Sequence, residues 1–351
     1  YSMVSNCKCA IWIMVLVAFQ SCCQNSSRSS VRLFFDNDSP VEVDLNRLDY
    51  ASIDEVGRID KVDCCPNGVL LISSNRLFLL DKDCATHKYV SAVGRTNEEY
   101  LGLWDAGFIN EGIFIYDLNG KKIMFFNFNG DFLRSHRTIS SVHGNPFQLF
   151  ASLDSLNYIG KCSYRGLDGY PELALYDKDF TFVKYVNEEM TLNSGLKMRV
   201  PFARTSRNSV LYSRLFYNDI YEVTNDSSFV KYNIDFGRYN YKRSKSKSDY
   251  EVVEDLRDYK GKCAVLISDM EEISNDYFAF SFIFPSSRRV GIYNMEDKSC
   301  DVISFKCRND EVLAYVKTFE RTLYVFTQTP DGQTRLYRIP FVKDAIHQLK
   351  E

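Results

Sequence analysis

Short apolar runs fill the chain from residue 31 onward, and clusters of Gly, Asn, Asp and Pro separate them. In many runs apolar and polar residues alternate, which is the pattern of a β-strand with one buried face. No stretch before residue 248 shows a long helical period. The pattern therefore predicts an all-β chain.

One unit recurs along the chain: a strand that ends in a polar residue, a tight polar turn, and a further strand. The recurring strands are at 77–81, 123–127, 173–177, 220–224, 290–294 and 334–338. A second apolar strand precedes each of them, at 68–73, 112–117, 156–162, 209–213, 277–284 and 322–327. Two such strands joined by a short polar turn indicate a β-hairpin.

The ends of the six recurring strands are 46, 50, 47, 70 and 44 residues apart. Four of these steps match the repeat of about 40–50 residues that is typical of a propeller blade. Six units predict a six-bladed β-propeller of four-stranded antiparallel blades. An open β-sandwich, which also has evenly spaced strands, is the alternative.

Two further segments complete this prediction. The alternating strand at 40–45 is expected to close the ring as the outer strand of the last blade, which removes exposed edges. The long step predicts an insertion at about 237–262, between blades four and five. Within it Ser248 and Glu251 form a capping-box pattern, which predicts a short surface helix.

The first residues have the pattern of an export signal. Residues 10–19 are all apolar and would span roughly 15 Å as a helix, about half of a bilayer core. A basic residue precedes this run and small residues follow it, as in a signal peptide. The end of the run, Phe19-Gln-Ser-Cys22, resembles a lipobox and predicts lipidation at Cys22. A plain secretory signal and a buried strand are the alternatives.

These features predict three parts: a lipoprotein signal peptide at 1–21, a flexible tether at 22–35, and the propeller at 36–351. Residues 24–30 are polar, so they suit a tether that holds a folded domain off a membrane. The 43 basic and 46 acidic residues give a net charge of −3. Interspersed charges of this kind argue against a nucleic-acid partner.

A series of motifs follows in order along the chain: residues 56–62 (VGRIDKV), 77–81, 93–100 (VGRTNEEY), 113–117, 122–127, 130–134, 217–222 and 231–237. With the signal at the front, this series resembles the six-bladed β-propeller lipoprotein family of Bacteroidota, whose fold is similar to that of NHL-type propellers. The resemblance implies the fold and the envelope location, and it carries over no catalytic residues. Thr96-Asn-Glu98 replaces the glycine- and proline-rich loop usual in that family.

The chain shows no motif that specifies a reaction. Its eleven Cys include no Cys-x-x-Cys, and its four His do not accompany a Gly-x-Ser-x-Gly or a phosphate-binding glycine loop. We therefore predict no metal and no cofactor, and the catalytic residues are unknown. The aromatic residues that can stack on a sugar or a peptide are Trp104, Tyr239, Tyr241 and Tyr250.

The predicted function is a non-catalytic binding or scaffolding module of the cell envelope. Its partner would be an envelope protein or a small ligand at the mouth of the central channel, where loops from all blades converge. The domain would touch a membrane only through the lipid anchor, on the periplasmic or the outer face. Two alternatives stay open: a metal-dependent hydrolase or lyase with its site in the channel, and a purely structural envelope component.

Overall fold

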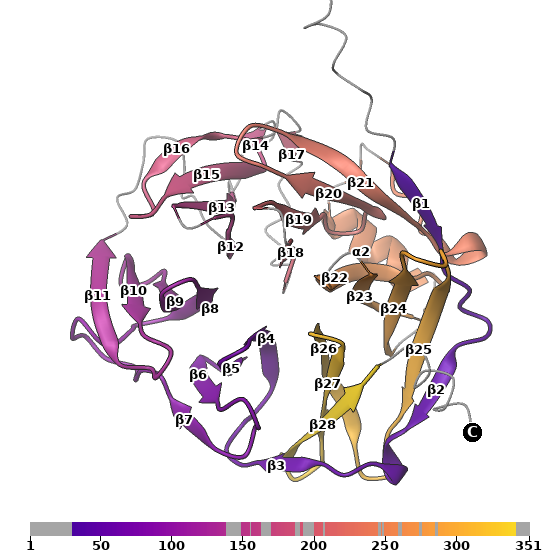
Figure 1. Cartoon of the computed structure of the whole chain (residues 1–351), viewed down its shortest axis with the longest axis horizontal. Coiled ribbons are helices and arrows are strands. Elements are labelled where there is room, and N and C mark those ends of the chain that lie inside the picture. The colour runs from indigo at the N-terminus through magenta and orange to yellow at the C-terminus, as the bar shows by residue number, and fades with distance from the viewer. Residues whose placement is uncertain are drawn as a thin grey trace, which may run out of the picture.

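Six sheets stand around a central axis in the computed structural model (Figure 1), so the predicted six-bladed β-propeller is confirmed. The structure describes residues 30–341, except 138–148, 155, 163–169, 187–189, 192–199, 206–207, 245–246, 248, 259–261, 274–275 and 285–286. In blades one to five, four antiparallel strands run in chain order from the axis to the rim, whereas blade six has three such strands and takes its fourth from the N-terminal segment.

The first three blades follow one another without interruption of the blade order. Blade one contains β4 (Ile59–Cys65), β5 (Gly68–Ser73), β6 (Arg76–Leu80) and β7 (His87–Tyr89). Blade two contains β8 (Leu103–Ile109), β9 (Gly112–Asp117), β10 (Lys122–Phe126) and β11 (Phe132–Arg137). Blade three contains β12 (Leu149–Ser152), β13 (Asn157–Lys161), β15 (Leu173–Asp177) and β16 (Phe182–Tyr185), and its loops pair as β14 (Tyr170–Pro171) and β17 (Met190–Thr191).

The last three blades each gain a strand from the N-terminal segment. Blade four contains β18 (Phe202–Arg204), β19 (Val210–Ser213), β20 (Asp219–Val223) and β21 (Ser228–Asp235). Blade five contains β22 (Val265–Ile273), β23 (Tyr277–Ile283), β24 (Arg288–Asn294) and β25 (Cys300–Lys306). Blade six contains β26 (Val312–Phe319), β27 (Thr322–Gln328) and β28 (Thr334–Pro340).

The N-terminal segment runs along the rim of these three blades (Figure 1). β1 (Val31–Phe34) pairs in parallel with β21, and β2 (Val41–Asp44) pairs in parallel with β25. β3 (Ala51–Ile53) pairs antiparallel with β28 and supplies the fourth strand of blade six. The ring is therefore closed by a strand from the opposite end of the chain.

Two predictions about this segment were wrong. The strand expected at 40–45 lies on blade five, and β3 closes blade six instead. Alternation of Val41 and Val43 specifies a strand with one buried face, but it does not specify which edge that strand joins. The C-terminal boundary of the predicted tether at 22–35 is too late in the chain, because β1 is already paired with β21 and both Leu33 and Phe35 are buried.

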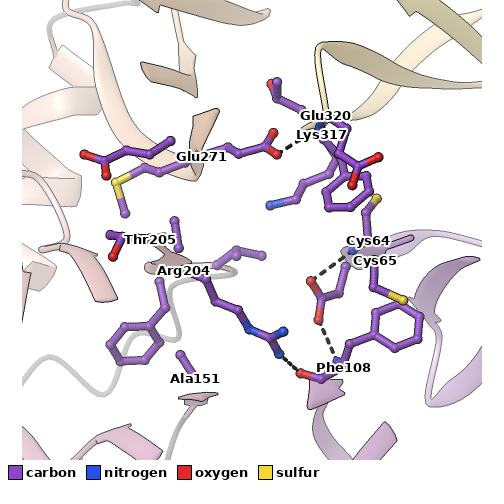
Figure 2. A pocket seen from close by; sticks show the side chains of 18 of the residues that line it. Cys64, Cys65, Phe108, Ala151, Arg204, Thr205, Glu271, Lys317 and Glu320 are labelled. Carbon is purple, nitrogen blue, oxygen red and sulfur yellow. Dashed lines mark hydrogen bonds between the residues drawn. The ribbon is translucent and has the colours of Figure 1, made fainter. Parts of the chain in front are cut away.

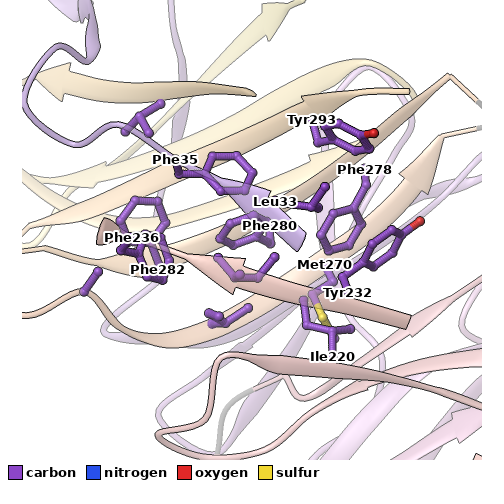
Figure 3. Close-up of a cluster of buried hydrophobic side chains, with 14 of the residues drawn as sticks. Leu33, Phe35, Ile220, Tyr232, Phe236, Met270, Phe278, Phe280, Phe282 and Tyr293 are labelled. Carbon is purple, nitrogen blue, oxygen red and sulfur yellow. The ribbon is translucent and has the colours of Figure 1, made fainter. Parts of the chain in front are cut away.

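Among the described residues the core forms seven clusters, and six of them each fill the space between two neighbouring blades. A central strand therefore buries both of its faces, which explains why β5 and β9 are buried at every position. The cluster between blades four and five is rich in aromatic rings (Figure 3); it includes Tyr232, Phe278 and Phe280.

The segment between β21 and β22 contains the helices of this region. A 3-10 turn, η2 (Gly237–Tyr239), comes first, and α2 (Asp249–Asp258) follows. A second 3-10 turn, η1 (Leu45–Arg47), joins β2 to β3. Val252 of α2 is fully buried in a cluster with Leu215 and Phe216, which lie between β19 and β20, so the helix packs on this turn of blade four. The predicted capping residue Ser248 lies outside the described residues.

Candidate ligand site in the central channel

The innermost strands of all six blades stand around the propeller axis (Figure 1), and their residues line a cavity of about 440 Å³ (Figure 2). Its lining includes residues from β4, β8, β12, β18, β22 and β26. A cavity of this volume is in the range of sites for small organic molecules. The charged residues of its wall are Lys61, Asp63, Arg204, Glu271, Glu272, Lys317 and Glu320.

Lys317 of β26 is the buried cation of this wall. Its side chain extends from the strand into the cavity (Figure 2), and the residue is 7% exposed. Within the described part of the chain, its ammonium group has no hydrogen bond and no carboxylate at ion-pair distance. Burial lowers the pKa of Lys317, but the carboxylates of Asp269, Asp63 and Glu271 raise it more, so the pKa lies above its ordinary value. Lys317 is therefore charged.

Glu271 of β22 faces the same cavity from the neighbouring blade. Burial raises the pKa of Glu271 to about 7, and the nearby ammonium of Lys317 opposes this rise. Its Oε1 accepts a hydrogen bond from the backbone N–H of Glu320 at 3.0 Å. Its Oε2 is sealed from solvent and has no hydrogen-bond partner among the described residues. Glu271 is thus partly neutral near pH 7 and compensates only part of the Lys317 charge.

Arg204 of β18 reaches the cavity from blade four, two blades along the ring from Lys317 (Figure 2). One amino group of its guanidinium donates to the backbone carbonyl of Phe108. The structure records no other partner for Arg204 within the described residues, and the residue is exposed to the cavity. A guanidinium has five N–H donors, so Arg204 retains donors for a bound molecule.

Asp63, Lys61 and Glu272 of the wall are already bonded within the protein, whereas the Glu320 side chain is exposed. The carboxylate of Asp63 accepts the backbone N–H groups of Cys64 at 3.0 Å and Phe108 at 2.8 Å, which joins blade one to blade two. Lys61 donates to Asp105 at 2.7 Å. These bonds fix the innermost strands β4 and β8 against each other.

Glu272 belongs to the same set of engaged groups. It accepts hydrogen bonds from Lys231 at 2.5 Å and from the Tyr232 hydroxyl at 2.7 Å. Both donors belong to β21 of blade four, so this carboxylate joins blade four to blade five.

A buried carboxylate, Asp269, supports the wall between blades five and six. It accepts from the Tyr315 hydroxyl at 2.6 Å and from the Arg288 guanidinium at 3.3 Å. The Ser268 hydroxyl donates to it as well, at 2.8 Å. The position of β22, and with it Glu271, therefore depends on this network.

Three of the four aromatic residues predicted as contacts are described by the structure, and they are not part of the cavity lining. Trp104 lies on β8 and packs against the core between blades two and three. Tyr239 packs against the core between blades four and five, and its hydroxyl bonds to Asp38. Tyr241 is buried against α2, where its hydroxyl donates to Asp255 at 2.9 Å.

For two of the predicted residues, the structure describes no side-chain contact. Tyr250 lies in the first turn of α2, and its side chain is outside the described part. Cys22 lies outside the described residues altogether. Contact of a partner with the four aromatic residues stays a prediction, and so does lipidation at Cys22.

The charged residues of the channel were missed in the sequence. The signal that points to them is a charged residue inside an apolar strand just ahead of a predicted hairpin, as with Lys317 in AYVKTF and Glu271 in DMEEI. Such a residue is costly to bury unless it is compensated. A polar side chain at the innermost strand of a blade is therefore a candidate channel residue.

The described residues also give information on metal binding, disulfide bonds and membrane-spanning helices. Among the described residues, no three Cys, His, Asp or Glu side chains converge closely enough to hold a metal ion. The cysteines of this part carry thiols, including the adjacent Cys64 and Cys65 at the cavity. No helix in the described ranges is long and apolar enough to span a membrane.

Fold and cavity together define a six-bladed propeller with a ligand-sized channel. The chain belongs to the 6-bladed beta-propeller family DUF5128, whose model matches residues 48–325. Its fold is similar to that of a candidate exported protein of Bacteroides fragilis, with a TM-score of 0.65 and 14% identity over 85% of this chain and 88% of that one.

A second solved structure, a DUF4221 family member from Bacteroides vulgatus, is also similar. It has a TM-score of 0.54 and 10% identity over 84% of this chain and 98% of that one. No curated protein matches the sequence. At these identities the solved structures support the fold and leave the ligand to be argued from the cavity.

Proposed function

We propose that this protein is an exported, lipid-anchored binding module that holds a small ligand in its central channel and catalyses no reaction. The observation that carries the proposal is the Lys317 ammonium, which is buried at the cavity without a hydrogen-bond or ion-pair partner among the described residues. A buried charge is costly unless it is paired. A ligand that supplies the missing acceptor gains this interaction on binding.

Binding is favoured over metal-dependent hydrolysis by the state of the carboxylates. Asp63 is bonded to backbone N–H groups, and Glu272 is bonded to Lys231 and Tyr232. These groups hold neighbouring blades together and do not converge on one point. A rigid wall with few uncommitted polar groups is typical of a binding site.

The anchor is supported by the lipobox-like end at Cys22 and by the path of the chain. β1 lies on the outer edge of blade four, on the rim and away from the cavity (Figure 1). A tether that joins the propeller at this edge leaves the channel open. The similar B. fragilis structure carries a name that refers to export, which agrees with this location.

One experiment tests each half of the proposal. Full-length protein and a Cys22→Ser variant are expressed with an alkyne-labelled fatty acid, and membranes are separated from soluble protein. We expect label and membrane association only when Cys22 is present, because two or more acyl chains give stable anchoring. Equal labelling of both proteins would contradict the anchor.

For the channel, the folded domain is screened against small organic molecules by thermal shift. A ligand that binds only the folded state raises Tm, by an amount that grows with the logarithm of its concentration relative to its Kd. The matched variant is Ala151→Trp, which fills the cavity wall at β12. Shifts that persist in Ala151→Trp, or no shift with any compound, would contradict a ligand in the channel.

A further inference from the structure

We propose that the channel binds an organic carboxylate with an apolar, ring-sized body, and that Lys317 and Arg204 hold the carboxylate from two sides of the ring. This inference rests on the proposed function and specifies the ligand of the same cavity. It is argued from the polar groups that the protein leaves uncommitted, from the balance of charge, and from the chemistry of the remaining wall.

The two uncommitted cations of the wall are donors. Lys317 has three N–H donors without a partner among the described residues, and Arg204 uses only part of its guanidinium on Phe108. Asp63 already accepts two backbone N–H groups. A molecule that enters the cavity therefore meets cationic donors that need acceptors, and a carboxylate offers two acceptor oxygens with a full negative charge.

Glu271 is a carboxylate of the protein that could compete with a ligand for Lys317, but it does not pair with Lys317. It lies outside ion-pair distance of Lys317, and among the described residues its one hydrogen bond is that from the Glu320 backbone N–H. Its burial favours the neutral form, with a pKa of about 7. Lys61 pairs with Asp105. Lys317 and Arg204 are therefore the cations of the wall that have no carboxylate at ion-pair distance within the described part of the chain.

The remaining wall is mostly apolar and aromatic. Phe108, Phe202 and Phe319 line the cavity together with Met270 and Pro201. Aromatic and thioether side chains pack well against ring systems and give little to polar bodies. A ring with one carboxylate matches this wall better than a polyhydroxylated or multiply charged acid. Such a carboxylate occurs in a free aromatic acid and at the end of a peptide whose last residue is aromatic.

The test uses the folded, anchor-free chain and pairs of probes that differ only in charge. Phenylacetate is compared with phenylacetamide, and N-acetylphenylalanine with its amide, by isothermal titration calorimetry. We expect each acid to bind about tenfold more tightly than its amide, because charge-assisted hydrogen bonds are lost in the amide. Stronger binding of phenylacetate indicates a free acid as the source, and stronger binding of N-acetylphenylalanine indicates a peptide end.

Three variants assign the contacts. Lys317→Met and Arg204→Gln are each expected to weaken the acids about tenfold and to leave the amides unchanged. Glu271→Gln is expected to strengthen the acids a few-fold, since it removes a like charge from the cavity. Lys184→Met is the matched control: Lys184 pairs with Asp226 on the exposed face of blade three, so acid binding should stay at the wild-type value. Circular dichroism checks that each variant is folded.

If Lys317→Met does not fold, Arg204→Gln and Glu271→Gln still test the inference. Arg204→Gln should lower the affinity for the acids, and Glu271→Gln should raise it. The inference is overturned if acids and amides bind equally, if neither variant changes acid affinity, or if no acid binds at about 10 mM. If only neutral ligands bind, and they bind the wild-type but not Ala151→Trp, the proposed binding function is supported and the inference of a carboxylate ligand is rejected. Absence of any channel ligand would remove both.

Discussion

The ring of Phe35 packs edge-on against the ring of Phe280, with 5.0 Å between their centroids (Figure 3). This contact fixes the segment after β1 to the core between blades four and five. Phe35 is fully buried, whereas its neighbour Phe34 is 57% exposed. The two adjacent phenylalanines therefore separate the contribution of burial from that of the backbone pairing of β1.

Phe35→Ala is expected to lower the free energy of unfolding by about 3–5 kcal/mol, because it leaves a cavity between two blades. Phe34→Ala should change it by about 0.5 kcal/mol or less, since exposed side chains contribute little. Urea denaturation of both variants measures the difference. Equal losses in the two variants would show that the N-terminal segment is held by its backbone bonds alone.

Gly112 begins β9 with a φ of 147°, and a Cβ at this position would overlap the carbonyl oxygen of Phe126 on β10. Gly68 of β5 meets Leu80 in the same way, so the constraint recurs at the same hairpin of blade one. Gly332 provides the control: it also has a positive φ, of 89°, but a Cβ there would meet no atom within 4 Å.

We expect Gly112→Ala to cost about 3 kcal/mol, as backbone strain and steric overlap add. Gly332→Ala should cost about 1 kcal/mol from strain alone. Thermal unfolding monitored by circular dichroism compares the two. A similar shift in Tm for both would mean that the strands of the hairpin separate easily enough to admit a methyl group.

The blades could be predicted from the sequence because each hairpin is local. The strand ends at Asp81, Asn127 and Asp177 repeat at a blade-length spacing, and their turns lie next to them in the chain. In the structure these residues end or directly follow the third strand of blades one, two and three. Periodicity reports such short-range order well.

The channel could not be predicted, because it is made by contacts between residues far apart in the chain. Arg204 bonds to Phe108 of blade two, and Lys317 and Glu271 belong to different blades. Within its own strand alone, each of these three residues is an ordinary charged residue. The edge joined by β2 escaped prediction for the same reason, because alternation defines a buried face and leaves the partner strand open.

Asp269 offers a test of the support beneath the cavity. It is 1% exposed and accepts from Tyr315 and Arg288, so Asp269→Asn leaves the buried Arg288 without its counter-charge. Breaking such a buried pair costs about 3–5 kcal/mol. Asp226→Asn is the control, because Asp226 pairs with Lys184 while its side chain is 88% exposed. Chemical denaturation should show a large loss for the first and about 1 kcal/mol or less for the second.

Glu271 should make the stability of the propeller depend on pH. Burial raises its pKa from 4.5 to about 7, against the ammonium of Lys317, and the groups that face it are Lys317, Glu320 and the backbone N–H of Glu320. Between these two pKa values the unfolded chain releases the proton while the folded chain keeps it. The contribution of Glu271 to stability is therefore full below pH 4.5, falls as pH rises, and levels off above about pH 7.

The size of this change is at most about 3 kcal/mol, given about 1.4 kcal/mol for each pKa unit. Glu271→Gln removes the titration and keeps the acceptor for the Glu320 N–H. Relative to the wild-type, the variant should therefore gain stability between about pH 4.5 and pH 8, while the exposed Glu42→Gln should follow the wild-type profile. Urea unfolding across this range measures the three profiles. If the Glu271→Gln profile runs parallel to that of the wild-type, the carboxyl of Glu271 is ionised throughout, and it compensates more of the Lys317 charge than its raised pKa implies.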